Sequence, residues 1–151
     1  MHRADQSPDP ASLRTLAEGL ARTAGTTALA GRRELPIGQP PAHDTKSSLT
    51  DPVTEFDRAA EAYIVNELRR LRPDDAIVGE EGAADNGTSG IEWHIDPIDG
   101  TANFIAGIPH FCVSIACQVN GVIEHAVIYD PVKDELFTAD RGAGATLDGK
   151  R

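Results

Sequence analysis

Two strand-like runs joined by a two-residue turn constrain the fold of this chain more than any other feature. The runs cover residues 111–119 and 122–129, and the Asn120-Gly121 pair between them is a strong signal for a β-hairpin. Shorter strand-like runs follow at 135–139 and 145–147. Only two residues follow a second turn pair, Asp148-Gly149, so we expect the chain to stop in the middle of a sheet.

Two helices are expected before the strands. Asp9-Pro10 combines an N-cap acid with a proline at the first helical position, and apolar residues then recur at helical spacing. The second helix begins with Thr54 and Asp57, which have the Thr-x-x-acid spacing of a capping box, and it ends at Pro73. Residues 34–52 contain four prolines and are expected to form a loop.

Two further strands are expected between the second helix and the hairpin. One is the short apolar run 76–78, and the other is 91–96, which leads into a predicted turn at 97–100. Together the elements predict an α/β (α+β layered) chain, with N-terminal helices packed on a largely antiparallel sheet. With 151 residues, 40% of them hydrophobic, the chain is long enough to bury a core in a single domain.

The negative charge is concentrated in one window. The chain has 24 acids and 14 Lys or Arg residues, for a formal charge of −10, and residues 73–132 contain ten acids and no Lys or Arg. Such a surface disfavours nucleic acid and anionic membranes as partners. The acids form either a solvated face or, where they converge, a cation site.

We expect a cytoplasmic protein. The longest apolar stretch, 111–117, is too short to span a bilayer, and the first residues have no apolar signal core. The cysteines Cys112 and Cys117 lie five apart on a predicted strand, on opposite faces, and therefore cannot pair. This use of cysteine is typical of a reducing compartment.

Four acids near the predicted strand ends point to a metal. Asp96-Pro97 begins a predicted type I turn, which would bring the Asp96 and Asp99 carboxylates to one side, and Glu80 and Glu81 follow a buried strand. Carboxylates crowded together repel one another. With no base nearby in sequence and no Cys/His cluster, a hard divalent cation such as Mg²⁺ is the natural neutralising ion.

The residues after the predicted turn suggest phosphate as the ligand. Gly100 and Thr101 precede Asn103-Phe104, where a short helix could begin, and backbone N–H groups at a helix start bind phosphate well. Acids for a metal beside amides for phosphate are the arrangement of a metal-dependent phosphatase.

Each of these residues also has a structural interpretation. Asp96 and Asp99 could be turn formers, and Glu80 and Glu81 could be solvated loop acids. The other candidates would then be a capping-box acid (Asp57), a helix N-cap (Thr101) and a surface lysine (Lys46).

The motifs resemble those of the inositol monophosphatase family of Mg²⁺-dependent, lithium-sensitive phosphatases. Residues 93–104 are similar to its W-x-x-D-P-I-D-G-T-x-N-F signature, and residues 79–81 to its G-E-E motif. Residues 46–57 are similar to its K-x-x-x-x-D-x-V-T-x-x-D segment, and the three motifs stand in the family's order. The resemblance implies part of a layered α/β/α/β/α sandwich.

The resemblance also implies metal ligands. Glu80, Asp96 and the backbone carbonyl of Ile98 would hold a first Mg²⁺, and Asp96 and Asp99 would share a second. Two or three ions are expected in all.

Further roles follow from the same resemblance. Thr101 and Asp57 would orient and deprotonate the attacking water, and Glu81 would act nearby. The positions that would bind substrate are Gly100, Thr101 and Asp99, with Lys46 at the edge of the site.

Two departures from the family pattern affect the expected function. Ala102 stands where many members have a second threonine, and the C-terminal half with its W-D-containing motif is absent. Residues 1–151 are therefore expected to be the N-terminal metal-binding part of the fold. The alternative to an enzyme is a non-catalytic truncated fragment that binds metal without turnover.

The expected reaction is hydrolysis of a phosphomonoester, with myo-inositol monophosphate or a related sugar phosphate as the first choice of substrate. Same-fold phosphatases acting on histidinol phosphate, fructose 1,6-bisphosphate or 3′-phosphoadenosine 5′-phosphate are the alternatives. The expected partner is a small phosphorylated substrate, with no nucleic acid or membrane, and a full-length form is expected to be a homodimer.

Overall fold

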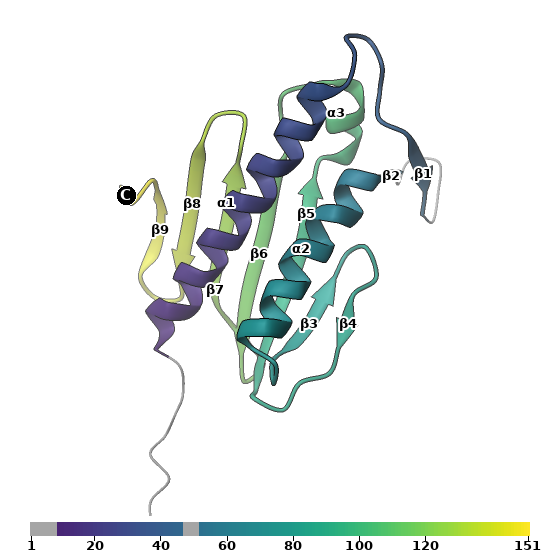
Figure 1. Ribbon diagram of the computed structural model, residues 1–151. Coiled ribbons are helices and arrows are strands. Elements are labelled where there is room, and N and C mark those ends of the chain that lie inside the picture. Colours follow the sequence, from purple (N-terminus) through teal and green to yellow (C-terminus); the bar gives the residue numbers. More distant parts are fainter. Residues whose placement is uncertain (1–8, 47–51) are drawn as a thin grey trace, which may run out of the picture.

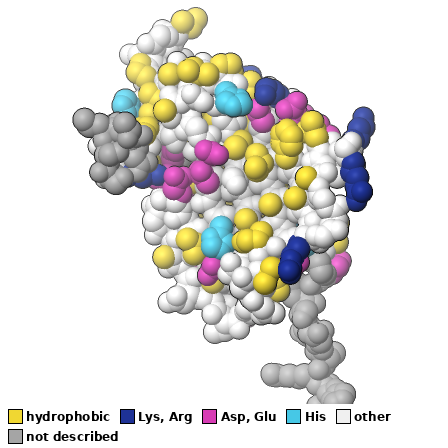
Figure 2. Space-filling model, turned by 180° about the vertical axis from the view of Figure 1, so that it is seen from behind, with side chains coloured by type: hydrophobic (Ala, Val, Ile, Leu, Met, Phe, Trp, Pro, Cys, Tyr) yellow, Lys and Arg dark blue, Asp and Glu magenta, His cyan; other side chains and the backbone are white. Residues whose placement is uncertain are grey.

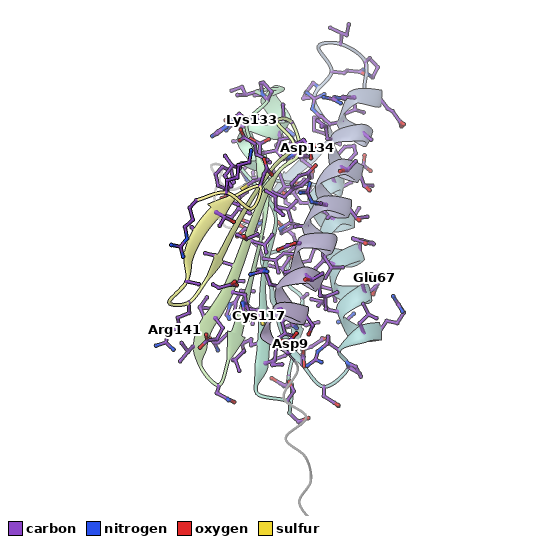
Figure 3. All side chains as sticks on the ribbon, turned by 90° about the vertical axis from the view of Figure 1, so that its left-hand side faces the viewer. Asp9, Glu67, Cys117, Lys133, Asp134 and Arg141 are labelled. Atoms are coloured by element: carbon purple, nitrogen blue, oxygen red, sulfur yellow. The ribbon has the colours of Figure 1, made fainter. Side chains whose placement is uncertain are left out.

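The computed structural model describes residues 9–46 and 52–151. Two long helices, α1 (Pro10–Glu34) and α2 (Glu55–Leu71), lie side by side on one face of a seven-stranded sheet (Figure 1). In the side view, the sheet and the two helices form two layers, and the described residues leave most of the opposite face of the sheet uncovered (Figure 3). The predicted packing of N-terminal helices on a sheet is confirmed.

The sheet has the strand order β4-β3-β5-β6-β7-β8-β9. The strand bounds are β3 Ala76–Gly79, β4 Ala84–Asp85, β5 Ile91–Asp99, β6 Cys112–Val119, β7 Val122–Asp130, β8 Glu135–Asp140 and β9 Gly144–Leu147. Neighbouring strands are antiparallel, except that β3 and β5 run parallel. The prediction of a largely antiparallel sheet is therefore confirmed.

Both predicted turn pairs adopt turn conformations. Asn120 (φ 49°) and Gly121 (φ 84°) are both in the left-handed region that a two-residue hairpin of type I′ requires. Asp148 (φ 49°) and Gly149 (φ 77°) repeat this arrangement, and an antiparallel bridge between Leu147 and Lys150 closes the second turn.

The helices begin where the sequence predicts. The Asp9 side chain accepts a hydrogen bond from the N–H of Ala11 (3.3 Å), and Pro10 is the first residue of α1. α2 opens with the complete capping box formed by Thr54 and Asp57. Both N-termini thus have acceptors for backbone N–H groups that the helix itself leaves unpaired.

Three short strands were not predicted. β1 (His43–Thr45) and β2 (Pro52–Thr54) pair with each other inside the predicted loop, and β4 lies in a polar segment. Strands of two or three residues are too short to show an alternating pattern, so only their pairing reveals them. Ser47, Ser48 and Asp51 of the K-x-x-x-x-D segment lie outside the described residues.

The core lies between the helices and the sheet. Trp93, Ile64, Leu68 and Val113 are each 0% exposed, and each such burial stabilises the fold by about 1.5–3 kcal/mol. Cys117 is buried and Cys112 lies on the other face of β6; both are free, as predicted. No helix in the described part of the chain is both long and apolar enough to cross a bilayer.

The uncovered face of the sheet, called the open face below, carries half-exposed apolar side chains. Ile128, Phe137 and Leu147 lie directly beside one another across β7, β8 and β9 and are 36–41% exposed. Figure 2 shows this face, with apolar side chains scattered over it and a group of acidic side chains gathered in one part of it.

Candidate active site

The structure brings the predicted site residues to one end of the sheet. They come from the residue after β1, the start of α2, the turn after β3, the end of β5 and the start of α3 (Thr101–Ala106). These positions are Lys46, Asp57, Glu80, Glu81, Asp96, Ile98, Asp99, Gly100 and Thr101.

Asp57 uses its two carboxylate oxygens for two different tasks. Oδ2 accepts hydrogen bonds from the backbone N–H (2.9 Å) and the hydroxyl (2.5 Å) of Thr54, which completes the capping box. Oδ1 accepts a hydrogen bond from the Thr101 hydroxyl (2.7 Å), 44 residues away in sequence. The capping interpretation and the predicted contact with Thr101 therefore hold together, at a side chain that is 0% exposed.

The end of β5 corrects the predicted turn. Asp96 and Asp99 belong to the strand, which runs to Asp99 because Pro97 and Ile98 are buried and extended. A regular strand would point residues three apart to opposite faces. A register shift between Asp96 and Asp99 realigns them, since they pair with Ser114 and Cys112, which are two apart on β6. The bulge, rather than a type I turn, places both carboxylates on the open face.

The turn after β3 carries Glu80 and Glu81 beside Asp96. The backbone N–H of Glu80 donates to the Ile95 carbonyl (3.0 Å), which ties this turn to β5 next to Asp96. Lys46 Nζ lies 2.8 Å from Glu81 Oε1 and 3.5 Å from Glu80 Oε1. The lysine predicted at the edge of the site therefore contacts two of its acids.

Burial and like charges perturb the acids of this cluster. Burial, the Glu80 carboxylate and the nearby Asp99 together raise the pKa of Asp96 from 3.8 to about 8, and Lys46 opposes this only in part. Burial also raises the pKa of Glu81, with Lys46 opposing it and Asp57 and Glu80 adding to it. These carboxylates are close enough to repel one another, so the site favours an added positive charge.

The cluster has the chemistry of a cation site without being closed around one. Among residues 9–46 and 52–151, no three Asp, Glu, His or Cys side chains converge tightly enough to hold a metal ion as they stand. Within that same part, the buried Oδ1 of Asp96 has no hydrogen-bond partner. An unpaired buried oxygen beside further carboxylates fits a hard divalent cation, for which Glu80, Asp96 and Asp99 could supply ligands.

Several acids of the base-free window do not reach this site. Asp85, Asp75 and Glu124 pair with Arg69, Arg72 and Arg141, which lie outside the window in sequence. The window therefore lacks basic residues only along the chain, because arginines from outside it pair with three of its acids in space.

Gly100 shapes the turn between β5 and α3. Its φ of +94° lies in the left-handed region, and a Cβ at this position would lie 3.2 Å from the His110 carbonyl oxygen. Gly100 itself is the N-cap residue, and no side chain caps α3. The interpretation of Thr101 as an N-cap is therefore wrong, because its hydroxyl contacts Asp57 and the Ile98 carbonyl (3.0 Å) instead.

One buried acid next to the cluster was not predicted. Glu61 is 4% exposed, and its carboxylate accepts hydrogen bonds from the backbone N–H groups of Glu81 (2.7 Å) and Ala83 (3.0 Å). The available signal was its position four residues after Asp57, which puts both acids on the same face of α2.

Comparison with known proteins identifies the family of this chain. The model of the inositol monophosphatase family matches residues 9–151. The chain belongs to the inositol monophosphatase family. A relative from Pseudomonas aeruginosa, named Nus factor SuhB, is 58% identical over 104 residues, which are 67% of this chain and 38% of the relative.

Solved structures of the family share the fold. The extragenic suppressor protein suhB of Bartonella henselae has a TM-score of 0.84 and 38% identity, over 93% of this chain and 53% of the other. An IMPase of Thermotoga maritima has a TM-score of 0.81 and 36% identity, over 91% and 51%. A structure described as inositol monophosphate bound SaIMPase-II has a TM-score of 0.73 and 29% identity, over 92% and 48%. The chain thus spans about half the length of the family structures it matches.

Proposed function

We propose that this chain carries the metal-binding and water-activating part of a Mg²⁺-dependent phosphomonoesterase. The observation that carries the proposal is the hydrogen bond from the Thr101 hydroxyl to the buried Asp57 carboxylate (2.7 Å) beside the Asp96 cluster. It joins a hydroxyl, which can accept a hydrogen bond from water, to a carboxylate, which can take up the proton that the hydroxyl passes on, next to acids that favour a cation. Family membership supports phosphatase chemistry in general.

The carboxylates of Glu80, Asp96 and Asp99 and the backbone carbonyl of Ile98 would hold two or three Mg²⁺ ions. When bound, Mg²⁺ supplies charge that favours ionised water and stabilises the leaving oxygen. Glu81 would help to orient water between these residues and Lys46. Because Lys46 lies 2.8 Å from Glu81, its ammonium supplies part of the charge that the acids need.

Thr101 and Asp57 would handle the proton of the attacking water. The Thr101 hydroxyl has one proton, which it donates to Asp57 Oδ1, so a lone pair on Oγ can accept a hydrogen bond from water. A positioned acid–base pair of this kind accelerates a reaction by roughly 10²–10⁴-fold.

We propose myo-inositol monophosphate or a related sugar phosphate as the substrate. The backbone N–H groups of Gly100 and Thr101 would bind its phosphate beside Asp99. The family member SaIMPase-II, described as bound to inositol monophosphate, supports this substrate class. Hydrolysis of histidinol phosphate, fructose 1,6-bisphosphate or 3′-phosphoadenosine 5′-phosphate would need the same phosphate contacts and stays an alternative.

A phosphate-release assay tests the proposal. The 151-residue chain is incubated with myo-inositol 1-phosphate and increasing Mg²⁺, beside Thr101→Val and the control Thr138→Val. Thr138 also has a hydrogen-bonded hydroxyl, to Thr146 (2.9 Å), but it lies in β8. We expect weak Mg²⁺-dependent release from the 151-residue chain, and we expect this release to fall roughly 100-fold or more in Thr101→Val only. Equal rates in all three proteins would refute the proposal, whereas Mg²⁺ binding without release would favour the non-catalytic alternative.

A second candidate is a role shared with the relatives named Nus factor SuhB. The 58% identity to the Pseudomonas aeruginosa relative favours it. If that role does not depend on turnover, Thr101→Val should retain it. Replacing the SuhB of Pseudomonas aeruginosa by this chain, with and without Thr101→Val, would separate the two functions.

A further inference from the structure

Glu61 is an acid that the proposed function does not use and that the fold does not expose. It lies in the middle of α2 and is 4% exposed, although buried acids are rare unless they are paired. Within the described residues it forms no ion pair with a Lys or Arg side chain. Its carboxylate accepts hydrogen bonds from backbone N–H groups of the turn that carries Glu80 and Glu81.

The two hydrogen bonds hold this turn on both sides of Gly82. Oε2 accepts from the N–H of Glu81 (2.7 Å) and Oε1 accepts from the N–H of Ala83 (3.0 Å). A carboxylate that accepts from two N–H groups makes charge-assisted bonds, which are shorter and stronger than neutral ones. The orientation of Glu81 is therefore fixed from α2, while Glu80 is fixed from β5 through its N–H bond to Ile95 (3.0 Å).

Gly79 at the start of the turn makes this contact possible. A Cβ at position 79 would lie 2.5 Å from the carboxylate carbon of Glu61, so any side chain there would have to displace this carboxylate. The glycine of the G-E-E motif thus leaves room for a carboxylate from another element. The Glu61 carboxylate fills the space that the missing side chain of Gly79 leaves.

Two successive turns of helix α2 therefore hold two parts of the site. Asp57 and Glu61 are four residues apart and lie on the same helix face. Asp57 holds the Thr101 hydroxyl, and Glu61 holds the turn with Glu80 and Glu81. One rigid element thereby fixes the acid–base pair and two of the acids relative to each other.

We propose that Glu61 is a positioning residue that sets the cation affinity of the site by holding the turn between β3 and β4. The inference rests on the proposed function, in that Glu80 and Glu81 serve the cation. Outer partners of metal ligands typically change metal affinity by about 10–100-fold when they are replaced. Glu61 acts one step further out, through the backbone of the turn.

Glu61→Gln is the first test. Glutamine has one acceptor oxygen where glutamate has two, so one of the two backbone N–H groups loses its acceptor. The volume of the side chain stays nearly the same. The matched control is Glu67→Gln on the same helix, where the side chain points away from the sheet (Figure 3) and pairs with Arg70 (2.7 Å). Mg²⁺ titrations followed by amide NMR signals give the dissociation constant of the folded protein, which a loss of stability alone would not change.

We expect Glu61→Gln to raise the Mg²⁺ dissociation constant about tenfold or more and Glu67→Gln to leave it unchanged. The amide protons of Glu81 or Ala83 should also exchange faster with solvent in Glu61→Gln. An unchanged dissociation constant would overturn the proposal. Unchanged exchange at both amides would overturn it as well.

The double variant Glu61→Ala/Gly79→Ala is the second test. Gly79→Ala alone should weaken Mg²⁺ binding because its methyl group displaces the carboxylate of Glu61. In the Glu61→Ala background the methyl group meets no carboxylate, so the two effects should be strongly non-additive. Strict additivity would overturn the proposed contact.

The outcomes also separate this inference from the proposed function. If the unaltered chain shows no Mg²⁺-dependent signal changes, the proposed function is refuted. In that case only the contact between Glu61 and the turn can be tested, by the exchange of the Glu81 and Ala83 amide protons in Glu61→Gln. Faster exchange with unchanged Mg²⁺ affinity would mean that Glu61 supports the fold and not the site, which also overturns the proposal.

Discussion

Replacing Asp57 by asparagine should separate the structural and chemical tasks of one buried carboxylate. Asp57 is 0% exposed and accepts from the Thr54 backbone N–H (2.9 Å), the Thr54 hydroxyl (2.5 Å) and the Thr101 hydroxyl (2.7 Å). Asparagine has one acceptor oxygen and one donor group. If its oxygen keeps the cap, its NH₂ group faces Thr101, whose proton must then turn to the Ile98 carbonyl at 3.0 Å.

The loss of stability and the loss of rate in Asp57→Asn can both be estimated from the contacts of Asp57. One charge-assisted hydrogen bond is lost in the buried site, which corresponds to about 2 kcal/mol of unfolding free energy. For a chain of this size that lowers the melting temperature by roughly 4–8 °C. The Thr101 hydroxyl then has no carboxylate to pass its proton to, so the rate of phosphate release should fall by roughly 10²–10⁴-fold.

A double-mutant cycle measures the contact without relying on activity. The unfolding free energies of Asp57→Asn, Thr101→Val and the double variant are compared by chemical denaturation, with exposed Glu55→Gln in the same helical turn as the control. We expect a coupling energy of about 1 kcal/mol between positions 57 and 101, and nearly equal rates for the three variants.

Two results would refute this reasoning. Additive stability effects would mean that the Asp57–Thr101 contact contributes nothing to the fold. A destabilised Asp57→Asn protein with a normal rate would leave Asp57 as a helix cap only.

Two further predictions concern pH and self-association. In the folded chain without metal the pKa of Asp96 is raised from 3.8 to about 8, so its stabilising contribution is complete below pH 4 and is lost as the pH rises through 8. Thermal melts without metal should therefore show stability falling between about pH 4 and pH 8, with a flatter profile in Asp96→Asn. An equal slope in both proteins would contradict the assignment of this effect to Asp96. The apolar open face should make the chain self-associate, because Ile128 and Phe137 are adjacent and each 41% exposed. Light scattering should show less association in Ile128→Ser/Phe137→Ser than in the control Val122→Ser beside the hairpin turn, and an equal molar mass would contradict this.

Local sequence signals were sufficient to predict the helix caps and turns, because their interactions join residues only a few positions apart. The capping box at Thr54 and Asp57, the N-cap acid Asp9 and the Asn120-Gly121 turn were all predictable. In each case the side chain or the glycine acts on the backbone next to it, so the sequence spacing alone specifies the geometry. The motif at residues 93–104 likewise identified the site before its geometry was known.

Tertiary structure alone decided how these parts meet. The second oxygen of Asp57 contacts Thr101 across 44 residues, and no local rule predicts such a contact. The bulge that aligns Asp96 with Asp99 arises from pairing with β6, because register belongs to two strands and not to one. Glu61 resembles any mid-helix acid in sequence, and its task appears only when the turn between β3 and β4 packs against it. The sequence by itself therefore determined which groups are available, and the packing of α2 against the sheet determined which of them act together.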